Sequence, residues 1–271
     1  MLGTTQSQSA IQIARSIIIS ILHLQLLLAL PLITIAPFYT DILIEILAGR
    51  RWANTQVPIT LAFYCLYLPF MGINGILESF VAGVAGQRGV SGWIQWLCGF
   101  WIIYAVIAIA LMGYAHLGGI GLVLANCLNM AMRIWFSYRF TNDWFRSSST
   151  SPSSSSSSSS NQENQLKDNR IRIIDFMPKI LTIFIWIIGG ICIALGRPWF
   201  QNAFVNSINT NSSGSLNRMT LFRIIFGGII TLICLFFTFH LEKEFFKTML
   251  IQWKIMKSNN SNKIKSDGKF E

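Results

Sequence analysis

The stretch that decides the fold is residues 16–38, SIIISILHLQLLLALPLITIAPF, which runs for 23 residues without an Asp, Glu, Lys or Arg. The hydrocarbon core of a bilayer is about 30 Å thick, and a helix needs about 20 apolar residues to cross it. A helix also satisfies its own backbone hydrogen bonds, as a lipid-facing segment must. The stretch is too long for a signal peptide and only Arg15 precedes it as a charge, so it predicts a transmembrane helix.

Five further tracts repeat this pattern. Two of them hold a single charged residue each, Glu78 and Arg133, and the other three hold none. Only 12% of the whole chain is charged, against about 25% in soluble domains. A soluble protein would have to bury six nearly uncharged helices under very little polar surface. The sequence therefore predicts an all-α polytopic membrane protein with about six transmembrane helices: 16–38, 57–87, 90–117, 118–138, 180–196 and 224–241.

The basic residues are divided unevenly between the two sides of such a protein. Six spans place both termini on one side, and that side receives sixteen of the 21 Lys and Arg residues. Since cytoplasmic loops carry the excess of Lys and Arg, both termini are predicted to be cytosolic. The sequence Asn211-Ser-Ser, an N-glycosylation pattern, falls in the 197–219 loop on the opposite, lumenal side.

Composition also divides the chain into segments. Residues 147–160 are almost unbroken serine, which cannot bury enough apolar surface to fold. Residues 39–52 place Asp41 and Glu45 opposite apolar residues, which predicts a short interfacial helix that ends at Gly49. We expect a four-helix block, a Ser-rich disordered cytosolic linker, an appended two-helix block and a basic cytosolic tail, unstructured from Ser258. Their bounds are 1–140, 141–170, 171–245 and 246–271.

Polar side chains inside the spans form two clusters. Asn74 and Glu78 are four residues apart, and Asn126, Asn129 and Arg133 have spacings of three and four, so each cluster shares one helix face. An ionisable group in a span costs roughly 2.5–3.5 kcal/mol and normally faces protein or water. The clusters either hold helices together or contact a polar substrate. A third interpretation, for the arginine alone, is that its side chain reaches the cytosolic interface.

Other sequence features argue against catalysis. Phosphate-binding loops, zinc-protease patterns, nucleophile elbows and paired aspartate motifs for a metal-bound diphosphate are all missing from the sequence. The five cysteines lie singly in apolar segments without metal or disulfide spacing. The charges lie in loops and tails rather than on a folded module. We therefore expect a protein that is not an enzyme, requires no ATP, metal or other cofactor, and binds no nucleic acid.

The two polar clusters lie in motifs that resemble the Rft family, the dolichol-linked oligosaccharide translocation proteins of the endoplasmic reticulum. The resemblance covers residues 15–140 well and 171–245 by layout only. The segments that carry it are YCLY at 64–67, INGILESF at 73–80, GLVLANCLNM at 121–130 with RI at 133–134, and, by position, AGRRW at 48–52.

The resemblance implies the multidrug/oligosaccharidyl-lipid/polysaccharide exporter superfamily, in which two helical bundles surround a cavity and alternate in access. It implies about twice as many spans as this chain has, so we expect a partial exporter-type bundle: the C-terminal half only, with the N-terminal half missing. The implied function is translocation of the lipid-linked oligosaccharide from the cytosolic to the lumenal leaflet for N-glycosylation. Membrane lipids and the missing half or other membrane proteins are the expected partners. A non-transporting membrane scaffold for glycolipid assembly is the alternative, and a membrane enzyme is a more distant one.

Overall fold

The structure is a computed structural model that describes residues 2–85, 87–149, 171–208 and 213–267. Side chains are described in these ranges except at 2–9, 50, 87–91, 93, 149, 197–208, 213–219, 255–256 and 258–267. The described residues are helical almost throughout and include no strand. The predicted Asn211 site lies outside the described residues, as does most of the predicted serine linker.

The first helix is followed by a short helical turn region. Helix α1 is Leu2–Thr34, and it is followed by the 3-10 turn Ala36–Tyr39 and by α2, Thr40–Ala48. Gly49 then adopts a φ of 87°, a left-handed conformation that glycine tolerates best, and α2 ends there. The short helix and its end at Gly49 are as predicted, and its interfacial position stays a prediction. One further turn, α3 at Arg50–Ala53, leads to the second long helix.

Three long helices follow: α4 at Val57–Val84, α5 at Gln87–Ile109 and α6 at Gly118–Ser149. Helix α5 ends in a π-helical turn, Ala110–Tyr114. The start of α6 lies close to its neighbours, because a Cβ atom at Gly121 would come within 3.0 Å of the Leu111 backbone. Helix α6 continues nine residues beyond position 140, so the first residues of the predicted linker are helical.

The C-terminal part of the chain forms four helices. They are the single turn α8 at Ile173–Phe176, then α9 at Ile180–Ile208, α10 at Ser213–Leu241 and α11 at Lys243–Asp267. The expectation of an unstructured tail from Ser258 differs from the structure, in which α11 continues to Asp267. Composition favoured disorder there, but the segment continues a helix that is already formed and so does not need a new nucleus.

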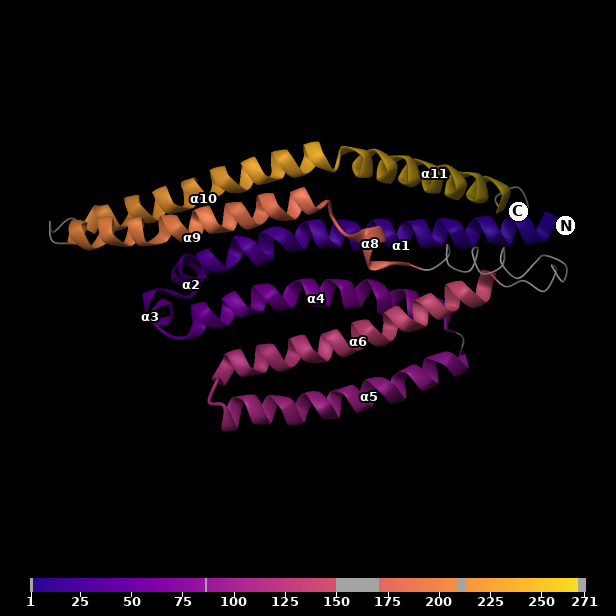
Figure 1. Ribbon diagram of the computed structural model, residues 1–271, viewed down its shortest axis with the longest axis horizontal. Helices are drawn as coiled ribbons and strands as arrows, with labels where there is room; N and C mark the ends of the chain where they lie inside the picture. Colours follow the sequence, from indigo (N-terminus) through magenta and orange to yellow (C-terminus); the bar gives the residue numbers. More distant parts are fainter. Residues whose placement is uncertain (1, 86, 150–170, 209–212, 268–271) are drawn as a thin grey trace.

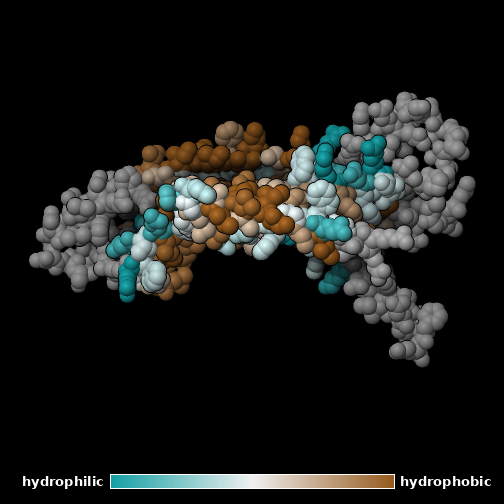
Figure 2. Space-filling model, turned by 90° about the horizontal axis from the view of Figure 1, so that it is seen from below, coloured by the Kyte–Doolittle hydropathy of each residue, from teal (hydrophilic) through white to brown (hydrophobic). Residues whose placement is uncertain are grey.

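Five helical segments are long and apolar enough to cross a membrane: Ala10–Thr34, Val57–Val84, Ile94–Tyr114, Gly118–Ser148 and Thr220–Leu241. The sixth predicted span corresponds to a shorter apolar segment, Ile180–Gly196. The prediction of an all-α polytopic membrane protein is confirmed. Figure 2 shows the matching surface, with hydrophobic residues over the middle of the molecule and hydrophilic residues toward both sides of that band.

The long helices lie side by side in a row (Figure 1). Helix α4 packs between α1 and α6, and α5 covers the outer side of α6. On the other side of α1 lie α9 and α10, and α11 runs along the first half of α1. We call the end where α1 begins and α11 ends the tail end, and the end that carries α2 and α3 the loop end. Helix α1 thus contacts both helical blocks.

Candidate functional site

The two charged residues predicted to lie inside spans form an ion pair between α4 and α6. Arg133 donates from Nε to Glu78 Oε1 at 2.7 Å and from an Nη atom to Oε2 at 2.6 Å. This two-point geometry is the strongest arrangement for a guanidinium and a carboxylate. The side chains are 25% and 15% exposed, respectively, so protein shields most of the pair. In the structure, the arginine side chain extends to the neighbouring helix α4 and binds Glu78 there.

The ion pair joins two residues that lie at different heights along α4 and α6. Gly119 of α6 lies against Thr60 of α4, and Cys127 packs against the cluster that contains Tyr67, which indicates an offset of 59 to 60 positions. That offset places Arg133 about 7 Å nearer the loop end than Glu78, at 1.5 Å per residue. Side chains on a helix lean toward its N-terminus, so Glu78 leans toward the arginine and shortens the gap. The long guanidinium side chain spans the rest.

The asparagines beside the ion pair have open hydrogen-bonding capacity. Asn74 and Asn129 are 5% and 7% exposed, and the Oδ1 atom of each is buried without a hydrogen-bond partner among the described residues. The buried hydroxyl of Ser137, two turns beyond Asn129, has none either. Asn126 is half-buried. We call these five predicted residues and Ser137 the α4–α6 seam: Asn74, Glu78, Asn126, Asn129, Arg133 and Ser137.

A second polar cluster at the tail-end half of the molecule surrounds Glu242, which is 2% exposed. Its Oε1 accepts hydrogen bonds from the Lys179 backbone N–H and from the Thr182 hydroxyl, both at 2.9 Å. Its Oε2 lies 3.6 Å from Nε2 of His23 on α1. The carboxylate thus sits at the N-terminus of α9, where the helix dipole favours negative charge. This Glu242 cluster joins α1, α9 and the start of α11.

Sequence reasoning missed the Glu242 cluster. Glu242 follows directly after the last apolar tract, where an acidic residue is typical of the end of a transmembrane helix. A single histidine in a span, such as His23, is more typical of helix packing than of a functional site. The available signal was a set of polar residues one turn apart inside apolar helices. One of them, Thr238, accepts a hydrogen bond from the Trp186 indole at 2.9 Å.

A third cluster joins the same two blocks at the loop end. Arg223 of α10 forms two hydrogen bonds with the Asp41 carboxylate, at 2.8 and 3.1 Å, and a third with the Phe38 carbonyl at 2.5 Å. The Tyr39 hydroxyl donates to the Arg223 carbonyl at 3.2 Å, and Gly227 leaves room for the phenol on α10. Burial raises the pKa of Tyr39 above its ordinary value, while the nearby guanidinium opposes that rise.

The described part of the chain contains no group of three His, Cys, Asp or Glu residues placed to hold a metal ion. The cysteines are free thiols, two of them buried, one half-buried and two exposed. The polar groups inside the described spans can donate and accept hydrogen bonds and exchange partners with a polar or charged molecule.

Comparison with known proteins places these residues in a family. A family model for Rft-1, the Rft protein, matches residues 1–252. Similar curated proteins bear the name Man(5)GlcNAc(2)-PP-dolichol translocation protein RFT1. The one from Eremothecium gossypii is 28% identical over 52% of this chain and 26% of its own length. The protein from Schizosaccharomyces pombe is 34% identical over 38% of this chain and 19% of its own length.

The same name belongs to a similar mouse protein, from Mus musculus, which is 27% identical over 55% of this chain and 27% of its own length. The matched part of the chain thus spans about a quarter of the length of these relatives. No solved structure matches the chain.

Proposed function

The chain belongs to the Rft protein family, and from that premise we propose that it is part of an endoplasmic-reticulum lipid transporter. The transported molecule would be dolichol-diphosphate-linked oligosaccharide, moved from the cytosolic to the lumenal leaflet for protein N-glycosylation. The names of the relatives support the substrate class. Because the chain matches only part of each relative, the activity is proposed for the complete protein, in which this chain provides one helical block.

The observation that carries the proposal is the ion pair in the α4–α6 seam, flanked by buried amides with open acceptors. A polar group in a span is costly and marks a polar pathway more often than a lipid-facing surface. An arginine that binds a carboxylate at two points has the geometry to bind a phosphate in the same way. Glu78 would neutralise Arg133 in the resting state, and the diphosphate of the lipid would replace Glu78 during passage.

The proposed mechanism is conformational rather than catalytic. In the structure, the Glu78–Arg133 ion pair holds α4 against α6. Exchange of the carboxylate for phosphate would release that contact and let one helical block move against another, which is the general scheme of alternating access. No cofactor takes part in this scheme, and the transporter would act without enzymatic chemistry.

The proposed orientation places the tail end in the cytosol and the loop end in the lumen. Basic residues support it: the segments on the side of the two termini, as the six predicted spans divide the chain, hold sixteen of the 21 Lys and Arg residues. An engineered glycosylation acceptor near Ser153 should stay unmodified, and Asn211 should be accessible to the lumenal transferase. Glycosylation in the serine segment would invert the orientation.

The decisive experiment measures transport directly. The complete protein would be purified into proteoliposomes with fluorescent lipid-linked oligosaccharide, and movement between leaflets would be followed by accessibility of the sugar to a lectin. We expect the wild-type protein to accelerate movement and the Glu78→Gln variant to do so much more slowly. Protein that leaves the lipid in place but still co-purifies with glycolipid-assembly enzymes would instead favour the scaffold function.

A further inference from the structure

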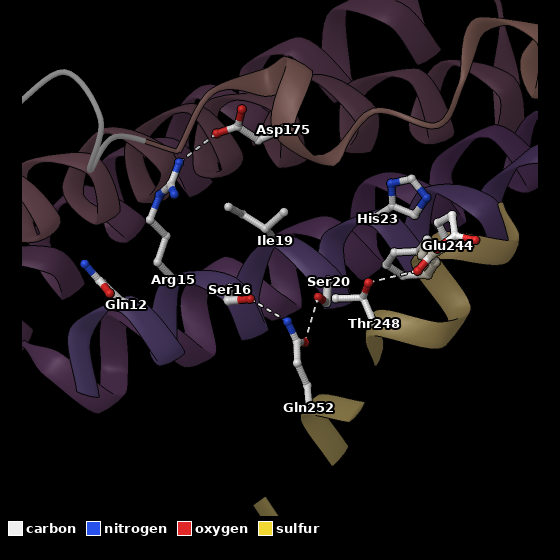
Figure 3. Close-up of a pocket in the computed structure, with 11 residues that line it drawn as sticks. Gln12, Arg15, Ser16, Ile19, Ser20, His23, Asp175, Glu244, Thr248 and Gln252 are labelled. Carbon is white, nitrogen blue, oxygen red and sulfur yellow. Dashed lines mark hydrogen bonds and ion pairs between the residues drawn. The ribbon is translucent and has the colours of Figure 1, made fainter. Parts of the chain in front are cut away.

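A groove runs between α1, α8 and α11, on the side of α1 that faces away from α4. Its volume is about 590 Å³, within the range of about 300–1,000 Å³ that is typical of small-molecule sites. Figure 3 shows α1 along its floor, with Ser16 and Ser20 pointing toward Gln252 of α11. Ile18 and Leu22 instead pack toward Leu77 in the other direction. The groove is therefore separate from the α4–α6 seam.

The polar lining of the groove is mostly uncharged. Gln252 accepts a hydrogen bond from Ser20 at 3.0 Å and donates one to Ser16 at 2.5 Å, which fixes α11 against α1. Gln12 and Thr248 add an amide and a hydroxyl to the same lining. Amides and hydroxyls both donate and accept hydrogen bonds, so they suit a ligand that also does both.

The charged groups around the groove disfavour an anion. The Arg15 guanidinium already donates to Asp175 at 2.9 Å, and Lys247 is paired with Glu244 at 3.0 Å. That pairing lowers the pKa of Glu244, so its carboxylate stays charged at the rim. His23, more than nine-tenths buried at the inner end, has its Nε2 atom 3.6 Å from the Glu242 carboxylate. The lining therefore offers amides, hydroxyls and carboxylates rather than a free cation.

We propose that this groove binds the neutral, hydroxyl-rich sugar ring of a membrane-anchored glycolipid. The hydroxyls would bond to the amides, serines and carboxylates, and Ile19 and Phe245 would cover the C–H face of the ring. The sugar would be lipid-anchored, because Ser16, Ser20 and His23 all lie within Ala10–Thr34, a segment long and apolar enough to cross a membrane. The proposal deepens the proposed function and rests on it for the identity of the sugar as mannose.

The test uses the full chain in lipid nanodiscs and octyl α-D-mannoside, a lipid-anchored sugar without phosphate. Binding would be followed by saturation-transfer NMR of the sugar protons. Gln12→Leu combined with Thr248→Val removes two polar groups of the lining, and we expect the Kd to rise about tenfold. The matched control is Gln95→Leu with Thr231→Val, because Thr231, like Thr248, bonds to the carbonyl four residues earlier and lies away from the groove. The control should bind as the wild type does.

Three results would overturn the proposal. They are unchanged binding in the groove variant, equal loss in the control, and displacement of the mannoside by octyl phosphate at equal concentration. Methyl α-D-mannoside that binds as tightly as the octyl form would refute the lipid anchor. The transport assay is independent of these measurements: sugar binding without transport by the complete protein refutes the proposed function alone, whereas transport without sugar binding refutes the groove alone.

Discussion

The α4–α6 seam and the Glu242 cluster both place a carboxylate among apolar helices, but the two carboxylates have different hydrogen-bond partners. At Glu242, one carboxylate oxygen accepts hydrogen bonds from Lys179 and Thr182 at the start of α9, and the other lies near His23. In the seam, the Glu78 carboxylate is matched by a single flexible arginine, and the amide oxygens of Asn74 and Asn129 remain open.

The two carboxylates differ in how easily they can change hydrogen-bond partners. A carboxylate held by backbone and hydroxyl donors of a fixed helix end cannot change partners without disrupting that helix, so it fastens elements together. An ion pair between two side chains can exchange partners, and buried open acceptors have a free-energy cost that packing alone does not explain. Under the proposed function, the Glu242 cluster therefore attaches the appended helices and the seam handles the substrate.

The largest expected effect is on transport by variants of the seam. In the complete protein, Glu78→Gln and Arg133→Gln should each lower the transport rate by at least about tenfold, because each leaves a polar partner unmatched in the membrane. The double variant should lose little more than either single variant, since both act on one interaction. The initial rate of lipid movement in proteoliposomes measures this. Strictly additive losses would refute the coupling, and full activity in all three variants would leave the pair a tolerated structural contact.

The second largest expected effect is on the free energy of unfolding of variants in the Glu242 cluster. Glu242→Leu removes the acceptor of two hydrogen bonds at the start of α9 and should lower the free energy of unfolding by roughly 2–4 kcal/mol. Glu242→Gln keeps an acceptor oxygen and should lose less than half of that. Unfolding by SDS titration in mixed micelles measures both. A Glu242→Gln variant that stays stable but loses transport would reverse the assignment of the two clusters.

A smaller effect should distinguish the open amides of the seam. Asn74→Leu replaces a buried group with an unpaired oxygen by an apolar group of similar size, so the free energy of unfolding should rise by about 1 kcal/mol while transport falls. The same titration and transport assays measure the two quantities. If stability drops instead, Asn74 holds the helices together and the first of the two interpretations of these residues is correct.

The smallest effect concerns the loop-end contact of Tyr39. Tyr39→Phe removes the hydrogen bond to the Arg223 carbonyl and should lower the free energy of unfolding by about 0.5–1 kcal/mol near pH 8. The pKa of Tyr39 is raised by burial, so the folded state favours the neutral phenol. The stability that it contributes is present below the ordinary value of 10.0 and is lost as the pH rises through the raised value. The difference between wild type and variant should therefore shrink above pH 10, and a constant difference up to pH 12 would contradict this account.

Hydropathy was enough to predict most of the fold. The tracts without charges became helices because lipid permits few other backbone conformations, and Gly49 ended the interfacial helix as its conformational freedom suggested. Helical spacing also placed Glu78 and Arg133 each on a polar face of its span. They were the only charged residues in those two predicted spans, so a contact between them was a reasonable expectation. The direct ion pair could not be predicted from the sequence, because the two residues were expected at different depths along their helices.

The contacts between blocks could not be predicted. Glu242 meets Thr182 and His23 across 60 and 219 positions, and spacing on one helix carries no information about partners that distant. The same applies to Arg223 and Asp41, whose charges could equally have been solvated. The groove beside α11 was also missed, because a polar tail was expected where the structure forms a helix.

Helix α1, which both blocks share, has a consequence for biosynthesis. The chain is made from its N-terminus at about 5–20 residues per second, so His23 emerges roughly 11–44 s before Glu242, its distant neighbour. During that interval α4 can cover one side of α1 while Ser16, Ser20 and His23 on the other side face lipid. Quality-control factors that recognise polar groups in a lone span would have their best opportunity then. A truncation before α9 should therefore be degraded faster than one that ends after α11.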